Sequence, residues 1–334
     1  MNKNTLLLTC SILSLSFSIF TQDRTPATRF TRHGHPRVAI IGAGAVGATI
    51  AYAIMLKNIG AEITLVDIDE KHCYGEVLDL SDALPFCYTP AVHFGTFQDA
   101  AHADIIIISA GARRKPGQSR IDLIKVNKSI LSSIFNSIGT INENPIILMV
   151  SNPVDIMTYL AQQLSGLESS HVFGSGTYLD TQRLRVRIAQ EIGISEVSVQ
   201  AYILGEHGDT QFAPWSIANI AGIPLTDFDN LSIPLLDEMA EETKNKGKEI
   251  IEHKGATYYG IGTCVATICE SIIFNKKHAL PVSCYIEQHD VVLSVPAVIG
   301  EYGIERILSI SLNENEDKKF MNSVKSLRSV IEQL

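Results

Sequence analysis

A histidine set between glycines, with an acid and an arginine upstream of it, is the feature of this chain best suited to proton transfer. His207 ends an apolar run in Tyr-Ile-Leu-Gly-Glu-His-Gly-Asp, residues 202–209. Asp180 and Arg183 are three positions apart, which places both on one face of a helix. A carboxylate can orient and charge a histidine, and a guanidinium can bind a carboxylate through two hydrogen bonds. Together they predict a proton-transfer site for a small organic acid.

A glycine-rich turn near the start of the chain predicts a second, phosphate-binding site. Gly42-Ala43-Gly44-Ala45-Val46-Gly47 follows an apolar strand pattern and opens a helical one. In such a turn Gly42 permits the tight bend, Gly44 lets the backbone approach a pyrophosphate, and Gly47 lets helix and strand pack closely. The positive end of the helix stabilises the phosphate charge. We therefore expect a dinucleotide here.

The acid at the end of the next strand indicates whether the dinucleotide is NAD or NADP. Asp67 follows Gly47 by twenty residues. Its carboxylate is expected to hold the ribose hydroxyls, and its charge would repel a 2′-phosphate. The predicted cofactor is therefore NAD and not NADP.

The first half of the chain alternates strand and helix patterns. Apolar strands are predicted at 37–42, 62–67, 103–109 and 145–150, and helices at 45–59, 71–80 and 120–138, with a Gly/Pro/charge loop at 111–119. The four consecutive isoleucines at 105–108 are typical of a buried parallel strand. This order predicts an α/β fold with a Rossmann doubly wound parallel sheet and ligand sites at the strand carboxyl ends.

The second half predicts a C-terminal mixed α+β substrate domain. The helix that carries Asp180 and Arg183 is followed by an expected strand at 197–204. Helices at 231–251 and 256–274, a hairpin of strands at 282–286 and 291–299, and a closing helix from about Asn313 complete it. We expect an N-terminal extension over 1–36, an NAD-binding domain over 37–175 and a substrate/catalytic domain over 176–334.

Composition excludes several classes of partner. The formal charge of the 334 residues is −9 with dispersed acids and no long basic tract, so we expect no nucleic acid partner. Beyond the N-terminus no segment reaches the roughly 18 apolar residues that span a bilayer, so no membrane partner is expected. The six cysteines form no Cys-x-x-Cys pair and no zinc-type cluster. We interpret them as reduced packing residues, and we expect no metal.

The N-terminus permits two interpretations. Residues 1–20 contain Lys3 followed by a mostly apolar, serine-rich run, which resembles a secretory signal but lacks a clear small-x-small cleavage site. The alternative is a disordered extension or an upstream start codon. We favour this alternative and a cytoplasmic protein, because reduced cysteines and a nucleotide cofactor fit a reducing compartment.

From Val38 to the C-terminus the chain resembles the L-lactate/L-malate dehydrogenase family. The resemblance rests on ordered, chemically distinct motifs at 42–47, 115–120, 151–155, 174–177, 180–183, 205–209 and 254–259. It implies an NAD-dependent dehydrogenase of 2-hydroxy acids that works as a homotetramer or homodimer. The alternative from another class is an inactive NAD-binding scaffold, although none of the four catalytic side chains described next is missing.

The resemblance implies a role for each of these residues. His207 would be the general acid/base and Asp180 would hold its tautomer and stabilise the imidazolium. Arg183 would bind the substrate C1 carboxylate. Arg120, carried in by closure of a lid at 111–119, would polarise the carbonyl. The Asp180–Arg183 pair could instead be an ordinary helix-surface ion pair.

Further residues are assigned to ligands by the same resemblance. Asn152 is expected to bond the substrate oxygen and to border the cofactor, and Thr257 to contact the substrate. Val46, Asn127, Ser175 and Ile261 are expected at the cofactor, with Ser175 and Ile261 against the nicotinamide.

The residue before Lys-Pro-Gly in the expected lid determines the predicted substrate. Family members that act on lactate usually carry glutamine there and malate enzymes carry arginine; this chain has Arg114. A second guanidinium would pair the second carboxylate of oxaloacetate in a water-poor site. We therefore predict oxaloacetate/L-malate, with pyruvate/L-lactate as the alternative. Glu206, Thr257 and Tyr258-Tyr259 favour the alternative, and Arg114 could instead be a solvated loop charge beside Arg113.

Regulation by a sugar bisphosphate is expected to be weak or absent. Many bacterial lactate enzymes of this family bind fructose 1,6-bisphosphate between subunits through an arginine and a histidine. Arg185 matches the arginine, but Gln200 stands where the histidine would be and cannot carry a positive charge.

Overall fold

The computed structural model describes residues 29–30, 34–112, 117–141 and 144–334. Its first half alternates strands and helices as predicted. The strands are β1 (Arg37–Ile41), β2 (Glu62–Val66), β3 (Val92–Phe94), β4 (Ile105–Ile108), β5 (Ile146–Met149) and β6 (Val172–Gly174). The helices are α1 (Ala45–Leu56), α2 (Glu70–Asp82), α3 (Phe97–Ala100), α4 (Arg120–Ile138) and α5 (Val154–Ser165).

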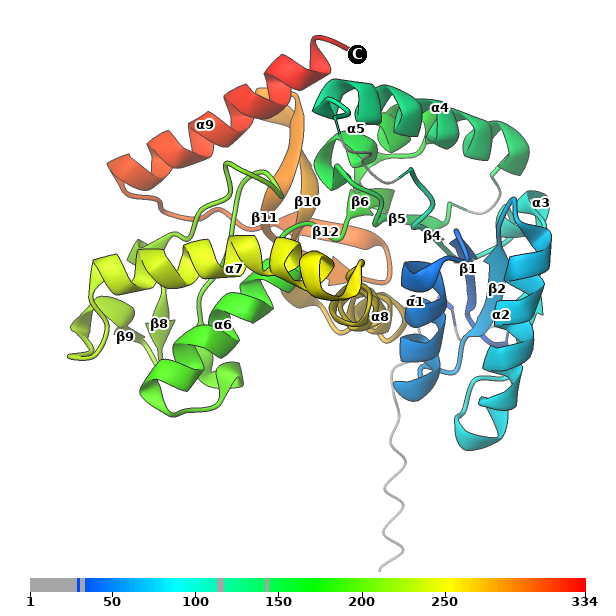
Figure 1. Ribbon diagram of the computed structural model, residues 1–334, viewed down its shortest axis with the longest axis horizontal. Helices are drawn as coiled ribbons and strands as arrows, with labels where there is room; N and C mark the ends of the chain where they lie inside the picture. Colours follow the sequence, from blue (N-terminus) through cyan, green and yellow to red (C-terminus); the bar gives the residue numbers. More distant parts are fainter. Residues whose placement is uncertain (1–28, 31–33, 113–116, 142–143) are drawn as a thin grey trace, which may run out of the picture.

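These six strands form a parallel, doubly wound arrangement in the order β6-β5-β4-β1-β2-β3. The chain runs outward from β1 to β3, then returns and runs the other way from β4 to β6. Because such crossovers are right-handed, the reversal puts helices on both faces. Figure 1 shows α4 and α5 along one side of the sheet and α1 against α8 (Tyr259–Ile273) on the other. The strand order reverses between β1 and β4, and in sheets of this kind the ligand crevice is expected at the carboxyl ends of the strands at that point.

The central strands are apolar on both faces because both are covered. All four isoleucines of β4 and all of β5 are buried. Continuous β-branched and apolar runs of this kind belong in a sheet that helices cover on both sides. The core is thus centred on β4 and β5, next to the crevice.

The second half contains α6 (Tyr178–Ile192), α7 (Ile233–Lys254), α8 and α9 (Glu314–Ile331). The strands β10 (His278–Ile286), β11 (Val291–Gly300) and β12 (Gly303–Ile307) form an antiparallel set that includes the predicted hairpin. They extend the main sheet to nine strands in the described chain, because β10 pairs with β6 at Ser283 and Gly174. A small sheet holds β7 (Val199–Gln200), β8 (Asn219–Ile220) and β9 (Ile223–Pro224).

The predicted strand at 197–204 is wrong over most of its length, since the strand covers only Val199–Gln200. Residues 201–203 bond to side chains of α6, and backbone pairing resumes only as isolated bridges from Leu204 to Phe212 and from Gly205 to Ser294. Ile203 N donates to Thr181 Oγ1 at 2.9 Å, and Arg185 Nε donates to the carbonyl of Ala201 at 2.9 Å. This irregular segment leads into the turn that carries His207.

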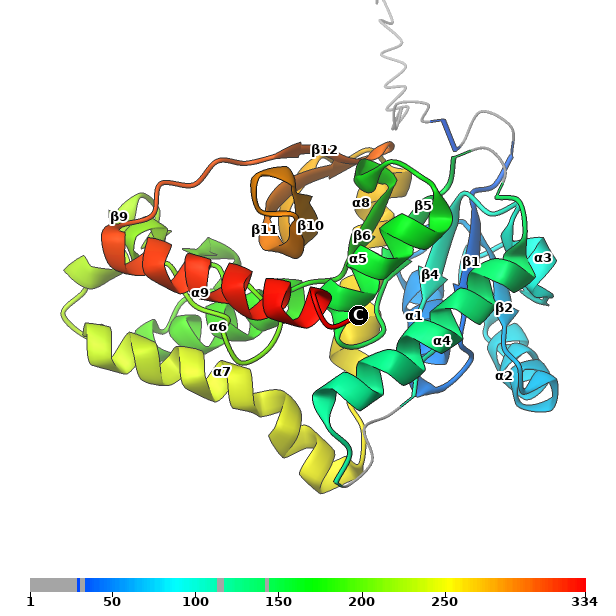
Figure 2. The same cartoon turned by 90° about the horizontal axis from the view of Figure 1, so that it is seen from above.

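The closing helix begins with a capping box between Asn313 and Glu316 and packs on α5 and β11. Figure 2 shows it crossing the second half and ending beside α4. There Lys128 Nζ donates to the carbonyl of Leu334 at 2.8 Å. None of the helices in the described ranges is long and apolar enough to cross a membrane.

Candidate active site

The structure brings His207, Asp180 and Arg183 into one ion-paired group. His207 Nδ1 lies 2.8 Å from Asp180 Oδ2, and Arg183 Nη1 lies 3.2 Å from Asp180 Oδ1. Asp180 lies in the first turn of α6 and its side chain is buried, whereas the side chain of His207 keeps 30% of its surface exposed. One buried carboxylate therefore contacts both the partly accessible imidazole and the guanidinium.

This geometry favours the charged form of both partners. Burial opposes ionisation of Asp180, but the charges of His207 and Arg183 outweigh it and lower the pKa of Asp180. Burial likewise opposes the charge on His207, but Asp180 outweighs it and raises the pKa of His207. With Nδ1 facing Asp180, Nε2 is the ring nitrogen left to donate a proton. The group can therefore act as a general acid near neutral pH.

The main chain of His207 is held by a second buried acid, which the sequence analysis did not single out. The N–H of His207 donates to Asp155 Oδ2 at 2.7 Å, and Ser283 Oγ donates to Asp155 Oδ1 at 2.6 Å. Burial raises the pKa of Asp155 to about 6, against the two hydrogen bonds and the charge of His207. One signal was available: Asp155 is the acid among the buried apolar residues of α5.

Arg120 lies where α4 begins, and its guanidinium is engaged by an acid next to His207 in the sequence. Its Nη2 is paired with Oε1 of Glu206, the residue before His207. The side chain of Glu206 is 1% exposed and that of Arg120 is 35% exposed. Sequence reasoning placed Arg120 at the substrate carbonyl and missed this pairing.

The other expected substrate residues lie around the crevice or outside the described chain. Arg114, on which the malate prediction depends, lies outside the described residues, as do residues 113–116 of the expected lid. Asn152 follows β5, and its carbonyl accepts from Asn127 Nδ2 at 2.9 Å. Asn127 Oδ1 also accepts from Ala112 N at 2.7 Å, so this side chain links the loops after β4 and β5. Thr257 is partly buried between α7 and α8.

The glycine turn has the shape that a dinucleotide requires. Gly42 has a φ of +104°, and a Cβ there would lie 2.6 Å from the nitrogen of Ala110. A Cβ on Gly47 would lie 1.8 Å from the carbonyl oxygen of Gly42. A Cβ on Gly44 would meet nothing within 4 Å, so the turn is open to the outside at the N-terminus of α1. Close packing on the inside and open space outside fit a bound pyrophosphate.

The remaining cofactor residues border this turn or the crevice. Asp67 Oδ2 accepts from Ala43 N at 2.7 Å, so the acid that should hold the ribose also fixes the turn. Ser175 is buried directly after β6. Val46 and Ile261 are partly buried on α1 and α8, two helices that pack together.

The two residues considered for sugar-bisphosphate binding are Arg185 on α6 and Gln200 on β7. Arg185 Nε donates to the carbonyl of Ala201, and its guanidinium lies 5.0 Å from the centre of the Tyr202 ring. Gln200 is exposed on β7. The weak or absent response to the bisphosphate stays a prediction.

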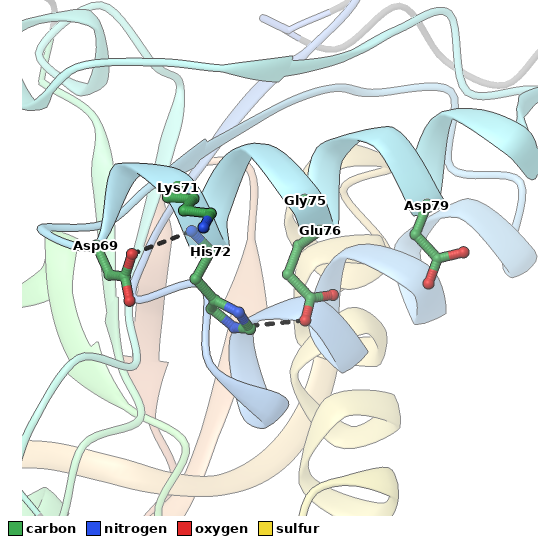
Figure 3. A pocket seen from close by; sticks show the side chains of 6 residues that line it. All are labelled: Asp69, Lys71, His72, Gly75, Glu76 and Asp79. Carbon is green, nitrogen blue, oxygen red and sulfur yellow. Dashed lines mark hydrogen bonds and ion pairs between the residues drawn. The ribbon is translucent and has the colours of Figure 1, made fainter.

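A separate pocket of about 410 Å³ lies along α2 (Figure 3). Its lining contains Asp69, which caps the helix by accepting from His72 N at 3.0 Å, and Glu76, whose Oε1 lies 3.4 Å from His72 Nε2. All of its lining residues belong to this one helix and its cap, so it is not part of the catalytic group. Over the described ranges no set of three His, Cys, Asp or Glu side chains is arranged to hold a metal ion.

Two family models match the chain. A lactate/malate dehydrogenase NAD-binding domain covers residues 36–174, and a lactate/malate dehydrogenase alpha/beta C-terminal domain covers 177–334. L-lactate dehydrogenase A of Rhizopus oryzae is 44% identical over 296 residues, which are 89% of this chain and 92% of that protein. L-lactate dehydrogenase of Kosmotoga olearia is 44% identical over 310 residues, which are 89% of this chain and 96% of that protein.

Two solved structures of lactate dehydrogenases have the same fold as this chain. A lactate dehydrogenase from a Medee basin deep-sea metagenome library superposes with a TM-score of 0.86 at 37% identity, covering 89% of this chain and 98% of that one. The minor L-lactate dehydrogenase of Enterococcus mundtii gives 0.85 at 38% identity, covering 90% and 98%. The predicted fold class, family and NAD cofactor are confirmed. The chain belongs to the lactate/malate dehydrogenase family, with an NAD-binding Rossmann domain followed by an alpha/beta C-terminal domain.

Proposed function

We propose that this protein is an L-lactate dehydrogenase, which interconverts pyruvate and L-lactate with NADH and NAD. The observation that carries the chemistry is the His207–Asp180–Arg183 group, with its raised histidine pKa and its buried carboxylate. The choice of acid is supported by the two relatives and two solved structures described above, all of which are named as lactate dehydrogenases. It replaces the oxaloacetate preference expected from Arg114 alone.

The residues divide the work between binding and proton transfer. Arg183 binds the substrate carboxylate, which brings the carbonyl oxygen within reach of His207. His207 then donates its proton to that oxygen, and Asp180 stabilises the imidazolium beforehand. NAD supplies or accepts the hydride when it is bound.

Oxaloacetate/L-malate remains a second candidate because one residue favours it. Arg120 and Arg183 are each already paired with a carboxylate, Glu206 and Asp180. The second carboxylate of oxaloacetate would need a further cation, since an unpaired buried charge is costly. Arg114 is the residue that could supply it.

Side-by-side initial rates of NADH oxidation with pyruvate and with oxaloacetate decide between the two acids. We expect the wild-type chain to prefer pyruvate, and we expect Arg114→Gln to leave that preference standing. Arg113→Gln is the matched control, a loss of the neighbouring charge. A wild-type preference for oxaloacetate that Arg114→Gln abolishes while Arg113→Gln does not would establish the malate reading. If the protein reduces neither acid, the alternative of an inactive NAD-binding scaffold is favoured.

We also propose that the chain assembles as a homotetramer or homodimer. Large apolar side chains stay exposed on adjacent helices of the single chain, including Tyr52 and Leu56 on α1 and Leu78 on α2. Sedimentation at micromolar concentration tests this, and a mass of one chain of 36.5 kDa would contradict it.

The proposed compartment is the cytoplasm. The support is chemical: five cysteines are free in the described chain, four of them buried, and free thiols fit a reducing compartment. The intact mass of the native protein, compared with that of the full sequence, tests whether N-terminal residues are removed.

A further inference from the structure

We propose that Glu206 is a positioning residue for catalysis, which holds the guanidinium of Arg120 beside His207. The inference rests on the proposed function only in that Arg120 must face the carbonyl of a 2-oxo acid. The pairing of Arg120 Nη2 with Glu206 Oε1 ties the guanidinium to the residue that directly precedes the proton donor in the sequence.

The carboxylate of Glu206 is fixed by contacts that do not involve Arg120. Thr210 Oγ1 donates to Glu206 Oε2 at 2.6 Å, and Ser326 Oγ of α9 donates to the same oxygen at 3.2 Å. Ser323, also on α9, donates to the carbonyl of Thr210 at 2.8 Å. Thus Oε2 is satisfied by hydroxyls, and Oε1 is directed to the guanidinium.

The main chain around Glu206 has little freedom to move. Gly205 exchanges two hydrogen bonds with Ser294 of β11, at 3.0 and 2.8 Å. A Cβ on Gly205 would lie 2.5 Å from Ser323 Oγ, so this loop lies directly on α9. Glu206 is therefore a fixed anchor to which the longer side chain of Arg120 is bound.

Arg120 can donate hydrogen bonds to a substrate while its guanidinium is paired with Glu206. A guanidinium has five N–H donors in a planar fork. Glu206 accepts from Nη2 of the guanidinium, and the other N–H groups remain available to donate to a carbonyl oxygen. A buried carboxylate of this kind is costly without a cation, so Glu206 favours the conformation of Arg120 that reaches the site. Preorganisation of this sort lowers the barrier because the charge is in place before the reaction.

A double-mutant cycle separates this role from a purely structural one. The variants are Glu206→Gln, Arg120→Lys and the pair, in the full-length chain with NADH and pyruvate. We expect Glu206→Gln to lower kcat by about tenfold or more, because the guanidinium loses its anchor. The KM for pyruvate should change less than kcat. In the Arg120→Lys background the same change should cost less than about twofold, since the group that Glu206 positions is already gone.

Glu316→Gln is the matched control. Glu316 is also a buried carboxylate; it caps α9 and accepts from Ser216, with no contact to Arg120. Glu316→Gln should lower the melting temperature and should leave kcat unchanged, both in the wild type and in Arg120→Lys. If Glu206→Gln fails to fold, Glu206→Asp keeps the charge but withdraws the carboxylate by one methylene, and the same loss of kcat is expected.

The Kd of oxamate in the NADH complex gives a second readout that needs no turnover. Oxamate has the shape of pyruvate but cannot be reduced. Glu206→Gln should weaken its binding by about threefold or more, and this effect should vanish in Arg120→Lys. Equal losses in both backgrounds, or no loss in either, overturn the inference. A wild-type chain that reduces neither acid overturns the proposed function instead, and the oxamate cycle still decides the role of Glu206.

Discussion

The main-chain N–H of His207 donates to Oδ2 of Asp155 at 2.7 Å. Asp155 comes from α5, and its other oxygen accepts from Ser283 of β10. The ring of the same histidine is held by Asp180 of α6. Two buried acids from two helices therefore fix the backbone and the side chain of the proton donor separately.

Replacement of Asp155 by asparagine should change how stability depends on pH. The pKa of Asp155 is about 6 in the folded chain, above the roughly 3.9 of an unfolded aspartate, so the folded state binds more protons between these values. The contribution of Asp155 to stability is therefore present below about pH 4 and is lost as pH rises through about 6. Wild type should gain about 1 kcal/mol over Asp155→Asn between pH 7 and pH 5.

Urea unfolding of both chains at the two pH values measures this difference. The comparison of variant with wild type cancels the titrating groups that do not interact with residue 155. His207 is the exception: the charge of Asp155 helps to raise its pKa, so the loss of that charge changes the pH dependence in the same direction. A gain of the variant over wild type on acidification would have the wrong sign and would refute the assignment.

Replacement of Asp180 by asparagine should lower the pKa of His207. In the wild type the charge of Asp180 outweighs burial and raises that pKa; without the charge, burial dominates and the pKa falls. Reduction of the 2-oxo acid needs protonated His207, so the alkaline limb of kcat/KM for reduction should move to lower pH. The maximal rate should fall by roughly 10²–10⁴, the usual contribution of a general acid.

The pH profile of Asp229→Asn, an exposed acid, serves as the control for the loss of one charge. It should superpose on that of the wild type. An alkaline limb that stays in place in Asp180→Asn would show that Asp180 does not set the protonation of His207.

Two glycines of the cofactor turn should respond oppositely to alanine. A Cβ at Gly47 would overlap the carbonyl oxygen of Gly42, so Gly47→Ala should lower the free energy of unfolding by about 2 kcal/mol or more. Gly44 has an ordinary φ of −68° and open space around it, so Gly44→Ala should fold normally. Its methyl group would occupy the approach of the pyrophosphate, and NADH should bind more weakly.

Melting temperatures and NADH titrations of the two variants test this contrast. Each variant is the control for the other. Tight NADH binding by Gly44→Ala would mean that the phosphates do not lie against this turn.

The first half of the fold could be predicted because its signals are local. The glycine turn, the isoleucine run of β4 and the strand–helix alternation each specify an element without distant contacts. The short strands β3 and β6 were missed because three residues carry no periodicity. The strand at 197–204 was overpredicted because an apolar run cannot show that its peptide groups bond to α6 side chains instead.

In the active site, too, the features with local sequence signals were predicted and those that depend on distant contacts were not. His207, Asp180 and Arg183 were placed together on motif and helix spacing, and the structure does bring them together. The pairing of Asp155 with His207 and that of Arg120 with Glu206 could not be foreseen, because each joins segments at least 50 residues apart through the folded chain. Arg114 was given the deciding role in substrate choice from its position before Lys-Pro-Gly and from its charge, and the relatives point the other way.

Replacement of Asp67 by asparagine should relax the choice of cofactor without loosening the turn. Asp67 Oδ2 accepts from Ala43 N, and an amide oxygen can accept the same hydrogen bond; the amide nitrogen cannot replace Asp67 Oδ1, which accepts from Asp69 N at 3.0 Å outside the turn. Removing the charge removes the repulsion of a 2′-phosphate, so the ratio of kcat/KM for NADPH to that for NADH should rise. Asp67→Ala is the informative companion, because it also loses the bond to Ala43 and should weaken both cofactors and lower the melting temperature. If the NADPH to NADH ratio is the same in wild type and Asp67→Asn, the charge of Asp67 does not select the cofactor, and its role is confined to fixing the turn.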